Sequence, residues 1–458
     1  MTKICNYRIV LAQKPTYNER RAAAFIRRGV RLITGATLEI VSDAEKPLPL
    51  EIVIGKTSRE ETDGMQFERS RKTLWEYKIC QKNERVYLTG LGLPAEEEYP
   101  YKHPYDIVDD GAYGTSIAAY RFTEDVLGYD FLFDAYCAYP ENPDLEMPED
   151  YAVDHTRDAM EQDHAPEMKG SAFWAVPSAR VLAWNMGCLI FRSREGRIVL
   201  IDGGLAPDCP RIIRLLKEIT GCKKPVVDAL LFTHLHSDHY GFYQRLCQDE
   251  ELGKQVQIKA FYHHLLPDEF YSEYSKEKSP EWQSVLDLIQ ASPHLLGTKL
   301  CKVEEGDTVT VDDLSFKVLR VPSEDTDAMM KMNMNDTSVI YRLDHESGQR
   351  MLLLADAEWV TSGDLDKLPP EELKADIVQM GHHGVGNVSH EIYRRIGGKV
   401  FLYQVAPRFW YSDKGEGQGS HVIGMARNLD WLMEDGAKRE NVLDTSRGIV
   451  ACSLPAKF

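Results

Sequence analysis

The chain of 458 residues has no apolar run close to the roughly 20 residues that span a bilayer, and no low-complexity tract or repeat of fixed period. Its opening residues, MTKICNYR, lack the charged-then-apolar order of a secretion signal. The nine cysteines include no CxxC pair, and an odd, unpatterned set is typical of reduced thiols. We therefore expect a cytoplasmic protein without a membrane segment, and we assign no cysteine to a metal.

Positive charge is also scarce, because 54 Lys and Arg stand against 72 Asp and Glu, which gives a formal net charge of −18. Such a surface repels phosphate backbones at long range unless a local basic patch reverses the field. No run of Lys or Arg flanks the motifs described below. Nucleic acid is therefore disfavoured as a partner.

The length exceeds what one hydrophobic core usually organises, and the composition changes along the chain. Residues 1–137 alternate strand-like and helical patterns and predict a small α/β domain. Residues 138–170 are rich in proline and acid without a sustained period, which predicts an interdomain linker. Residues 171–458 alternate strands with helices and predict a second, larger α/β domain.

Hydrophobic periodicity predicts individual elements in both domains. In the first domain we expect strands at 7–11 and 50–55, a hairpin over 75–90, and helices over 18–33 and 113–127. In the second domain we expect strands at 181–184, 188–192 and 197–201, and a helix over 210–220.

The strongest chemical signal is the segment DALLFTHLHSDHYG at 228–241, where an apolar strand runs into three imidazoles and one carboxylate. In an extended backbone His234 and His236 project to the same side and can reach one ion. Asp238 and His239 follow at the start of a helix and can face a second ion. Imidazole and carboxylate ligands suit divalent metals, zinc first, with manganese as the alternative. A merely histidine-rich polar turn is the competing interpretation, but the segment fits HxHxDH at every fixed position.

HLHSDH at 234–239 resembles the signature of the metallo-β-lactamase superfamily, and further segments resemble the family in its order. CLIFRSREGRIVLIDGG, which contains Asp202, resembles the opening strands of the family. MLLLADAEW resembles the segment that supplies a bridging carboxylate, here Asp356. ADIVQMGHHG resembles the last ligand loop, in which His382 matches the ligand. The resemblance implies an α/β fold, an αββα sandwich over about residues 175–455, here preceded by the smaller α/β domain. It also implies that Asp202 braces the histidine loop by hydrogen bonding.

The resemblance implies a set of metal ligands for one or two ions: His234, His236, Asp238, His239, Asp356 and His382. Asp238 is also expected to orient the nucleophile. His383 is expected beside the ligands or facing the substrate, and His421 is a candidate for substrate contact or proton transfer. The competing interpretations are a strand-ending turn for Asp356, a structural histidine pair at 382–383, and a solvated loop histidine at 421.

One departure from the family matters. Most members place another histidine ahead of the bridging aspartate, but this chain has none between His294 and His345. Only oxygen donors stand where it is expected: Glu324, Asp325, Asp327, Asn333, Asn335 and Asp336. The site of His234 and His236 is therefore expected to be completed by an oxygen ligand or water, or to bind its ion weakly. A missing nitrogen ligand also favours manganese relative to zinc.

Two narrower resemblances bear on function. NDTSVIYRL, LKADIVQMGHHG and HVIGMARNLDWLMEDG resemble the metallo-β-lactamase domain of bacterial DNA-uptake competence proteins, without their membrane channel. NERRAAAFIRRGVRLITGATLEIV and YGTSIAAYRFTEDVLG, within residues 5–130, resemble the small α/β domain that precedes the catalytic barrel of β-hexosaminidases and α-glucuronidases. That domain supports its neighbour, so a docking or structural module is expected here.

These features together predict a metal-dependent hydrolase, since a bound divalent ion lowers the pKa of its water and supplies a hydroxide nucleophile. The expected substrate is a phosphoester or ester, either a small molecule or linked to carbohydrate. The alternatives are a nuclease of the competence-protein type and a non-catalytic carbohydrate-associated protein with a degenerate metal site. The oligomeric state is left open.

Overall fold

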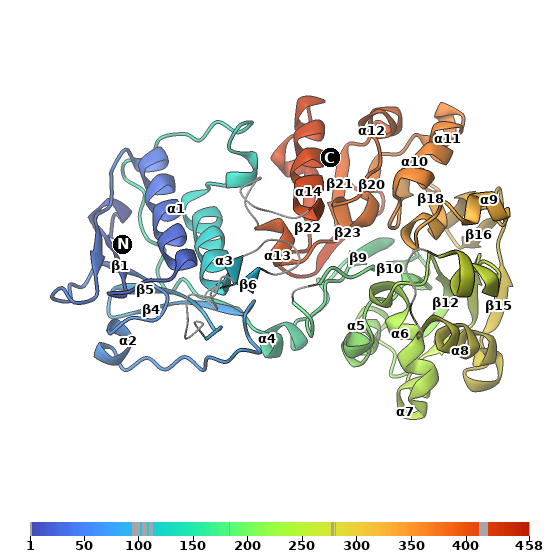
Figure 1. Ribbon diagram of the computed structural model, residues 1–458, viewed down its shortest axis with the longest axis horizontal. Helices are drawn as coiled ribbons and strands as arrows, with labels where there is room; N and C mark the ends of the chain where they lie inside the picture. Colours follow the sequence, from blue (N-terminus) through green and yellow to red (C-terminus); the bar gives the residue numbers. More distant parts are fainter. Residues whose placement is uncertain are drawn as a thin grey trace. The chain divides into compact units, whose positions relative to one another are not determined.

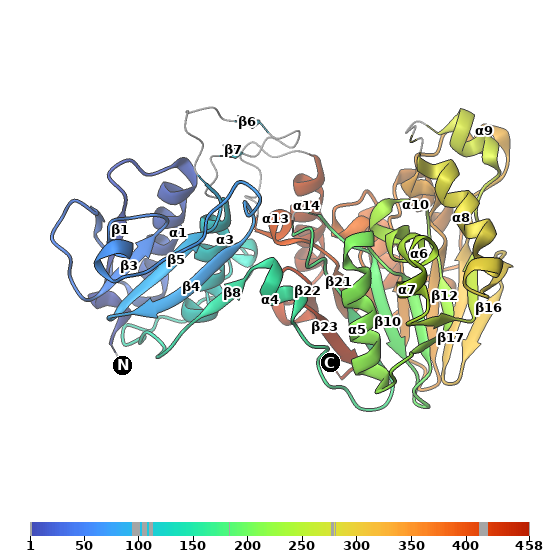
Figure 2. The ribbon, with the colours of Figure 1, turned by 90° about the horizontal axis from the view of Figure 1, so that it is seen from below.

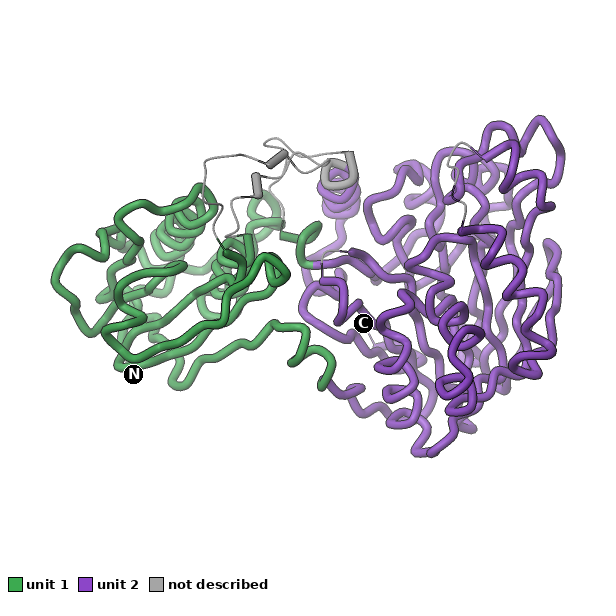
Figure 3. The backbone as a smooth tube through the Cα atoms, turned by 60° about the horizontal axis from the view of Figure 1, so that its bottom comes forward, with its two compact units in different colours: residues 1–162, 407–423 green, residues 163–406, 424–458 purple. Residues whose placement is uncertain are grey.

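The computed structural model describes residues 2–93, 101–102, 108–109, 113–182, 184–275, 279, 281–411 and 420–457. They form two compact units, drawn in green and purple in Figure 3: Met1–Gln162 with Pro407–Ile423, and Asp163–Ala406 with Gly424–Phe458. The chain thus leaves the second unit after Ala406 and returns to it at Gly424. Of the helices that the structure describes, none has both the length and the apolar character needed to cross a bilayer.

The first unit is built on a six-stranded mixed sheet in the order β2-β1-β3-β5-β4-β8. Its strands are β1 (Arg8–Leu11), β2 (Ile40–Ser42), β3 (Glu51–Ile54), β4 (Tyr77–Lys82), β5 (Arg85–Gly90) and β8 (Val153–His155). The predicted hairpin is confirmed, because β4 and β5 pair antiparallel. β8 pairs with β4, so residues 138–162 of the predicted linker belong to this unit.

Both helices predicted in the first unit are confirmed as α1 (Tyr17–Thr34) and α3 (Tyr113–Phe122), the latter followed by a π-turn over Thr123–Leu127. α1 begins with a capping box, in which Thr16 and Glu19 each accept a hydrogen bond from the other's backbone N–H. It ends at Gly35, whose φ of 74° places it in the left-handed region. Short elements complete the unit: α2 (Arg59–Thr62), β6 (Tyr101–Lys102), β7 (Val108–Asp109), α4 (Arg157–Glu161) and α13 (Pro407–Trp410).

The segment that returns from the second half of the sequence packs into the core of the first unit. Trp410 and Tyr411 are 0% and 1% exposed. The Tyr411 ring stacks on Tyr120 at 5.8 Å between centroids, and its hydroxyl donates to Glu124 at 3.0 Å. Residues 407–411 therefore belong structurally to a unit whose larger part, Met1–Gln162, ends 245 positions before Pro407.

The second unit contains two sheets. The first has the order β15-β14-β12-β11-β10-β9-β23, with β13 also paired to β12. Its strands are β9 (Ala172–Ala175), β10 (Cys188–Arg192), β11 (Ile198–Asp202), β12 (Val226–Leu231), β13 (Gln257–Ile258), β14 (Ala260–His263), β15 (Lys299–Lys302) and β23 (Val450–Ser453). The second sheet has the sequential order β16 (Thr308–Val311), β17 (Leu314–Arg320), β18 (Ile340–His345), β19 (Arg350–Leu353), β20 (Ile377–Gln379), β21 (Val400–Tyr403) and β22 (Val442–Asp444).

These sheets pack face to face, with helices on their outer sides (Figures 1 and 2). One core cluster joins the inner faces, for example Phe191 of β10 with Phe316 of β17. A second cluster joins the outer face of the first sheet to its helices, for example Ile190 with Leu216. The predicted αββα sandwich, preceded by a smaller α/β domain, is confirmed.

The helices of the second unit occupy the connections between strands. They are α5 (Cys209–Thr220), α6 (Ser237–Gln248), α7 (Glu250–Gly253), α8 (Glu281–Leu295), α9 (Thr326–Met329), α10 (Trp359–Asp366), α11 (Pro370–Leu373), α12 (His390–Ile396) and, from Gly424 on, α14 (Ser420–Glu434). The strand predicted at 181–184 is wrong, because the described residues Val181, Leu182 and Trp184 lie in no strand. Asp208 accepts hydrogen bonds from the backbone of Ala179 and Arg180, and Ser178 accepts one from Val181, so side chains stabilise a turn over 178–181.

Candidate metal centre

Four loops that follow parallel strands supply the predicted site residues. β11 and β12 are parallel neighbours in one sheet, and β19 and β20 are parallel neighbours in the other. Each of these strands ends just before a site residue or at one: Asp202 ends β11, His234 follows β12, Asp356 follows β19 and His382 follows β20. The carboxyl ends of parallel strands meet at one edge, where such folds place their sites.

The first group of possible ligands consists of His234, His236 and Asp356. His234 and Asp356 are 2% and 1% exposed, whereas His236 is partly exposed. The Nε2 atom of His234 lies 3.1 Å from Nδ1 of His236 and 3.7 Å from Oδ2 of Asp356. Two nitrogens and one oxygen thus converge as ligands of a single ion would.

The second group consists of Asp238, His239, Asp356 and His383. Asp238 and His239 lie in the first turn of α6, next to His236 at its N-cap. His239 Nε2 lies 3.3 Å from Oδ1 of Asp356, and His383 Nε2 lies 3.3 Å from Asp238 and 3.4 Å from Oδ2 of Asp356. Asp356 belongs to both groups, as expected of a bridging carboxylate.

Asp202 has the bracing position predicted for it. Its Oδ2 lies 2.8 Å from Nδ1 of His239, and its two oxygens accept hydrogen bonds from the backbone N–H and the hydroxyl of Thr233. The carboxylate therefore fixes the orientation of His239 and leaves Nε2 facing Asp356.

The structure places the two neighbouring histidines of the GHHG loop differently from the prediction. His383, expected as a catalytic residue, lies inside the second ligand group. His382, expected as the ligand there, has Nδ1 2.7 Å from Glu358 and Nε2 3.8 Å from Asp356. Glu358 was not predicted, although it stands two positions after Asp356. His421 lies in the first turn of α14, but its side chain is outside the described residues.

Four non-glycine residues at the centre have left-handed backbone conformations. Their φ angles are 57° at Asp202, 45° at Ala355, 47° at His382 and 58° at His383. Such conformations cost about 1–3 kcal/mol each and persist where the surroundings enforce them, often at functional sites. Half of the eight such residues in the described chain lie at this centre.

Buried opposite charges shift several pKa values at the centre. Burial would lower the pKa of His383, but the carboxylates of Asp356 and Asp238 raise it to about 9. Burial would raise the pKa of Asp356, but the imidazoles of His383 and His239 hold it well below its usual range. Burial, with His239 beside it, lowers the pKa of His234 well below its usual value. The imidazoles beside the buried carboxylates thus stabilise them as anions. A divalent ion would supply positive charge at the same place.

The donor atoms of the centre fit such an ion. His239 Nε2, Asp356 Oδ1 and His383 Nε2 are buried and have no hydrogen-bond partner among the residues that the structure describes. Buried polar atoms are almost always satisfied, so unpartnered ones that converge need an explanation. Imidazole and carboxylate are the ligands that zinc and manganese accept.

The oxygen donors expected to replace the missing histidine are mostly engaged elsewhere. Asp336 accepts from the backbone of Val360, Thr361 and Asn333. Asp325 caps α9, and Glu324 pairs with Lys302. Asn335 differs, because its amide nitrogen lies 3.5 Å from both ring nitrogens of His382 and its buried Oδ1 has no hydrogen-bond partner in the described part of the chain.

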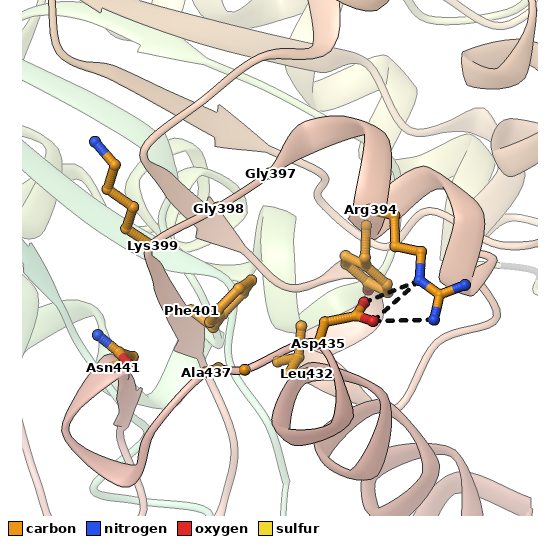
Figure 4. A pocket seen from close by; sticks show the side chains of 11 residues that line it. Arg394, Gly397, Gly398, Lys399, Phe401, Leu432, Asp435, Ala437 and Asn441 are labelled. Carbon is orange, nitrogen blue, oxygen red and sulfur yellow. Dashed lines mark hydrogen bonds and ion pairs between the residues drawn. The ribbon is translucent and has the colours of Figure 1, made fainter.

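A hollow in the surface of the second unit, shown in Figure 4, lies between α12, β21 and the end of α14 and has a volume of about 580 Å³. Its charged side chains are already paired: Arg394 bonds Asp435 at 3.0 Å, and Lys399 bonds Asp376 at 2.8 Å. None of the residues described as lining this hollow belongs to either group of possible metal ligands.

Comparison with known families agrees with this geometry. Residues 188–320 match the model of the metallo-beta-lactamase superfamily, a range that contains β10–β12 and the HLHSDH segment. ComE operon protein 3 from Bacillus subtilis (strain 168) is 26% identical over 202 residues, which are 43% of this chain and 21% of that protein. The matched region thus spans about a fifth of the relative's length.

Solved structures of similar fold include the metallo-beta-lactamase fold protein YhfI from Bacillus subtilis, at 14% identity and a TM-score of 0.38. That match covers 62% of this chain and 100% of the other. CmlA, a diiron beta-hydroxylase from Streptomyces venezuelae, matches at 12% identity and a TM-score of 0.38, covering 75% of this chain and 60% of the other. Both overlaps are too loose to support a functional comparison.

Proposed function

We propose that this chain, the C-terminal part of which is a metallo-β-lactamase domain distantly homologous to ComE operon protein 3, is a metal-dependent hydrolase. The position of Asp356 carries the proposal. Its Oδ1 faces His239, and its Oδ2 faces His234 and His383. One carboxylate between two donor groups suits a pair of divalent ions.

Each donor group has a defined part in this proposal. His234, His236 and Asp356 would hold one ion, and Asp238, His239, His383 and Asp356 would hold the other. Bound divalent ions activate water and polarise the bond to be cleaved. Asp238 has the most exposed side chain of the second group, at 24% against 2% for His383, so it is the carboxylate placed to orient the attacking water.

Zinc is the metal proposed first, because each group contains two imidazoles, and manganese is the alternative. The proposed substrate is a phosphoester or ester of a small or carbohydrate-linked molecule, since two ions can stabilise both the attacking and the leaving oxygen. The net charge of −18 argues against nucleic acid. A nuclease is the second candidate, favoured only by the distant homology to ComE operon protein 3.

The test compares the wild-type chain with Asp356→Ala and with Asp366→Ala, a control at an aspartate whose side chain is 66% exposed. Metal content is measured by mass spectrometry on protein purified without chelator, and hydrolysis on bis(p-nitrophenyl) phosphate and p-nitrophenyl acetate. We expect Asp356→Ala to lose more in metal affinity and hydrolysis than the roughly 10–100-fold caused by losing an outer-shell partner. Asp366→Ala should match the wild type.

The contrary outcomes separate the alternatives. Unchanged metal content and hydrolysis in Asp356→Ala would show that the centre is misassigned. Bound metal without hydrolysis of either ester would favour a non-catalytic protein. Cleavage of single-stranded DNA that weakens steeply with added salt would favour the nuclease.

A further inference from the structure

We propose that Trp359 and Met330 form an apolar subsite beside the metal centre, and that this subsite takes an aromatic group of the substrate. The inference rests on the proposed hydrolase function. It narrows the substrate to small esters or phosphoesters that carry an aromatic group next to the bond to be cleaved. Both residues lie in the second unit, and neither belongs to a group of possible metal ligands.

The exposed side chains of the metal centre show from which side a substrate can reach it. The side chains of Asp238 and His382 are 24% and 15% exposed, and His236 is partly exposed. Those of Asp356 and His383 are only 2% exposed. A substrate therefore approaches the shared carboxylate past the exposed residues, and side chains next to them are candidates for substrate contact.

Trp359 stands next to this accessible side. It directly follows Glu358, whose carboxylate lies 2.7 Å from Nδ1 of His382. Consecutive Cα atoms are about 3.8 Å apart, so the indole belongs to the residue adjoining the group that holds His382. Trp359 is 64% exposed, more than any other exposed large hydrophobic side chain of the described residues. A molecule bound at the centre can therefore reach an aromatic surface.

The packing of α10 does not depend on the indole of Trp359. Thr361 and Leu365 of the same helix are 0% exposed and face the core. The backbone N–H groups of Val360 and Thr361 donate to Oδ1 of Asp336 at 3.1 and 3.2 Å, which fixes the first turn of the helix. An ordered helix end thus leaves a large apolar ring in solvent. Apolar surface exposed beside a site is typical of a ligand contact.

Met330 lies in the segment that Asp336 joins to α10. The second carboxylate oxygen of Asp336 accepts from the N–H of Asn333 at 3.3 Å. The other methionines of the segment are buried, at 4%, 1% and 0% exposed: Met329, Met332 and Met334. Met330 itself is 49% exposed, although its neighbours anchor the segment in the core. Two exposed apolar side chains are therefore held on segments that share one carboxylate.

The chemistry of these two side chains favours an aromatic occupant. Indole rings attract other aromatic rings beyond the effect of the buried area, and a thioether makes favourable contacts with ring edges. The flexible methionine can also adapt to rings of different shape. The net charge of −18 disfavours a polynucleotide, so the aromatic group is expected on a small molecule. An aliphatic chain is the rival occupant that the experiment must distinguish.

The experiment compares p-nitrophenyl phenylphosphonate with p-nitrophenyl methylphosphonate, which share the leaving group and the bond to be cleaved. The metal-loaded full-length chain is measured as wild type, Trp359→Ala, Trp359→Phe and Met330→Ala. The control is Leu295→Ala, because Leu295 is 52% exposed but ends α8 four positions before β15 begins. The beginning of β15 lies at the edge of the parallel strands opposite to the centre.

We expect Trp359→Ala to lower kcat/KM about tenfold for the phenyl substrate and less than about twofold for the methyl substrate. Trp359→Phe should keep most of the preference for the phenyl substrate, and Met330→Ala should lose about threefold of it. Leu295→Ala should match the wild type.

Calorimetric titration with phenylphosphonate, cyclohexylphosphonate and methylphosphonate gives a second readout that needs no turnover. We expect phenylphosphonate to bind the wild type most tightly. Trp359→Ala should bind phenylphosphonate and cyclohexylphosphonate with equal affinity, because only the aromatic contact distinguishes these two rings.

The contrary outcomes separate this inference from the proposed function. Unchanged selectivity in Trp359→Ala and Met330→Ala would refute the subsite and leave the proposed function intact. An equal loss for both substrates in Trp359→Ala would indicate a structural role and would also refute it. Cyclohexylphosphonate bound as tightly as phenylphosphonate by the wild type would overturn the aromatic assignment. A chain that holds no metal and cleaves neither substrate would refute the proposed function itself.

Discussion

At the scale of single residues, the metal centre depends on how the neighbours of His239 fix the orientation of its ring. His239 is 2% exposed and is held by Asp202 on one ring nitrogen. Its ring packs directly against the backbone of Gly187, whose carbonyl also accepts from Gly203 at 3.2 Å. The space beside Gly187 is therefore part of the metal centre, although glycine contributes no ligand.

Gly187→Ala should displace the His239 ring. An added Cβ would lie 3.0 Å or less from three atoms of that ring, a separation that real Cβ atoms do not show. We expect the ion held by Asp238, His239 and His383 to bind about 10–100-fold more weakly, as after loss of an orienting partner. Titration of the metal-free protein with Zn²⁺ or Co²⁺ measures this loss.

Gly363→Ala is the matched control for that change. Gly363 lies inside α10, and an added Cβ would meet nothing within 4 Å. Alanine there should leave metal affinity unchanged and stabilise the protein by up to about 1 kcal/mol. Equal metal binding by Gly187→Ala and Gly363→Ala would contradict the role given to His239.

The sequence predicts the site residues well where they are contiguous. His234, His236, Asp238 and His239 stand within six positions, in the loop after β12 and the first turn of α6, so their closeness follows directly from the sequence. The different positions of the His382 and His383 side chains could not be predicted, because they depend on two successive residues with left-handed backbone conformations. No pattern of side chains in the sequence indicates such conformations. Glu358 was missed because its function arises only from a histidine 24 positions later.

At the scale of elements, Gln379 links the end of β20 to the turn that carries Asp356. Its Oε1 accepts from the N–H of Ala355 at 2.7 Å, and its Nε2 donates to the carbonyl of the same residue at 3.3 Å. Ala355 has a φ of 45°, which an alanine adopts only under constraint. The Gln379 amide therefore holds the strained residue that aims the shared carboxylate.

Gln379→Met should lower metal affinity about 10–100-fold by releasing that turn, although neither residue is a ligand. Adding Ala355→Gly should restore most of the affinity, because glycine reaches positive φ without strain. Metal titration of the two single variants and the double variant measures the coupling, and urea unfolding confirms that each folds. A double variant that binds metal as weakly as Gln379→Met would refute this role of the Gln379 amide.

Element prediction succeeds where the pattern is local and fails where side chains bind the backbone. α1, β10 and β11 follow their periodicity, and α1 also carries its caps in the sequence. The apolar residues at 181–184 favour a strand, but Asp208, almost 30 positions after Ala179, holds a turn at Ala179 and Arg180 that leads into them. Such long-range hydrogen bonds are invisible to a periodicity argument.

At the scale of the whole molecule, the second half of the sequence completes the core of the first unit. Residues 407–423 belong to the unit formed by residues 1–162, and this could not be predicted from local patterns. The resemblance of that unit to the small domain of β-hexosaminidases stays a prediction. Its dependence on residues 407–411 is a property of this chain that the structure adds.

Removing residues 1–162 should therefore expose an apolar patch rather than release a well-behaved domain. Phe409, Trp410 and Tyr411 are 4%, 0% and 1% exposed, and each aromatic side chain buries about 150–250 Å². Their exposure creates a patch of roughly 400 Å² or more, which promotes association.

We expect the chain of residues 163–458 to aggregate on size-exclusion chromatography. The same chain with Phe409→Ser, Trp410→Ser and Tyr411→Ser should elute as one species, because only the patch differs. A truncated chain that elutes as one species without those substitutions, and binds metal like the full-length protein, would show that the first unit is dispensable for the second.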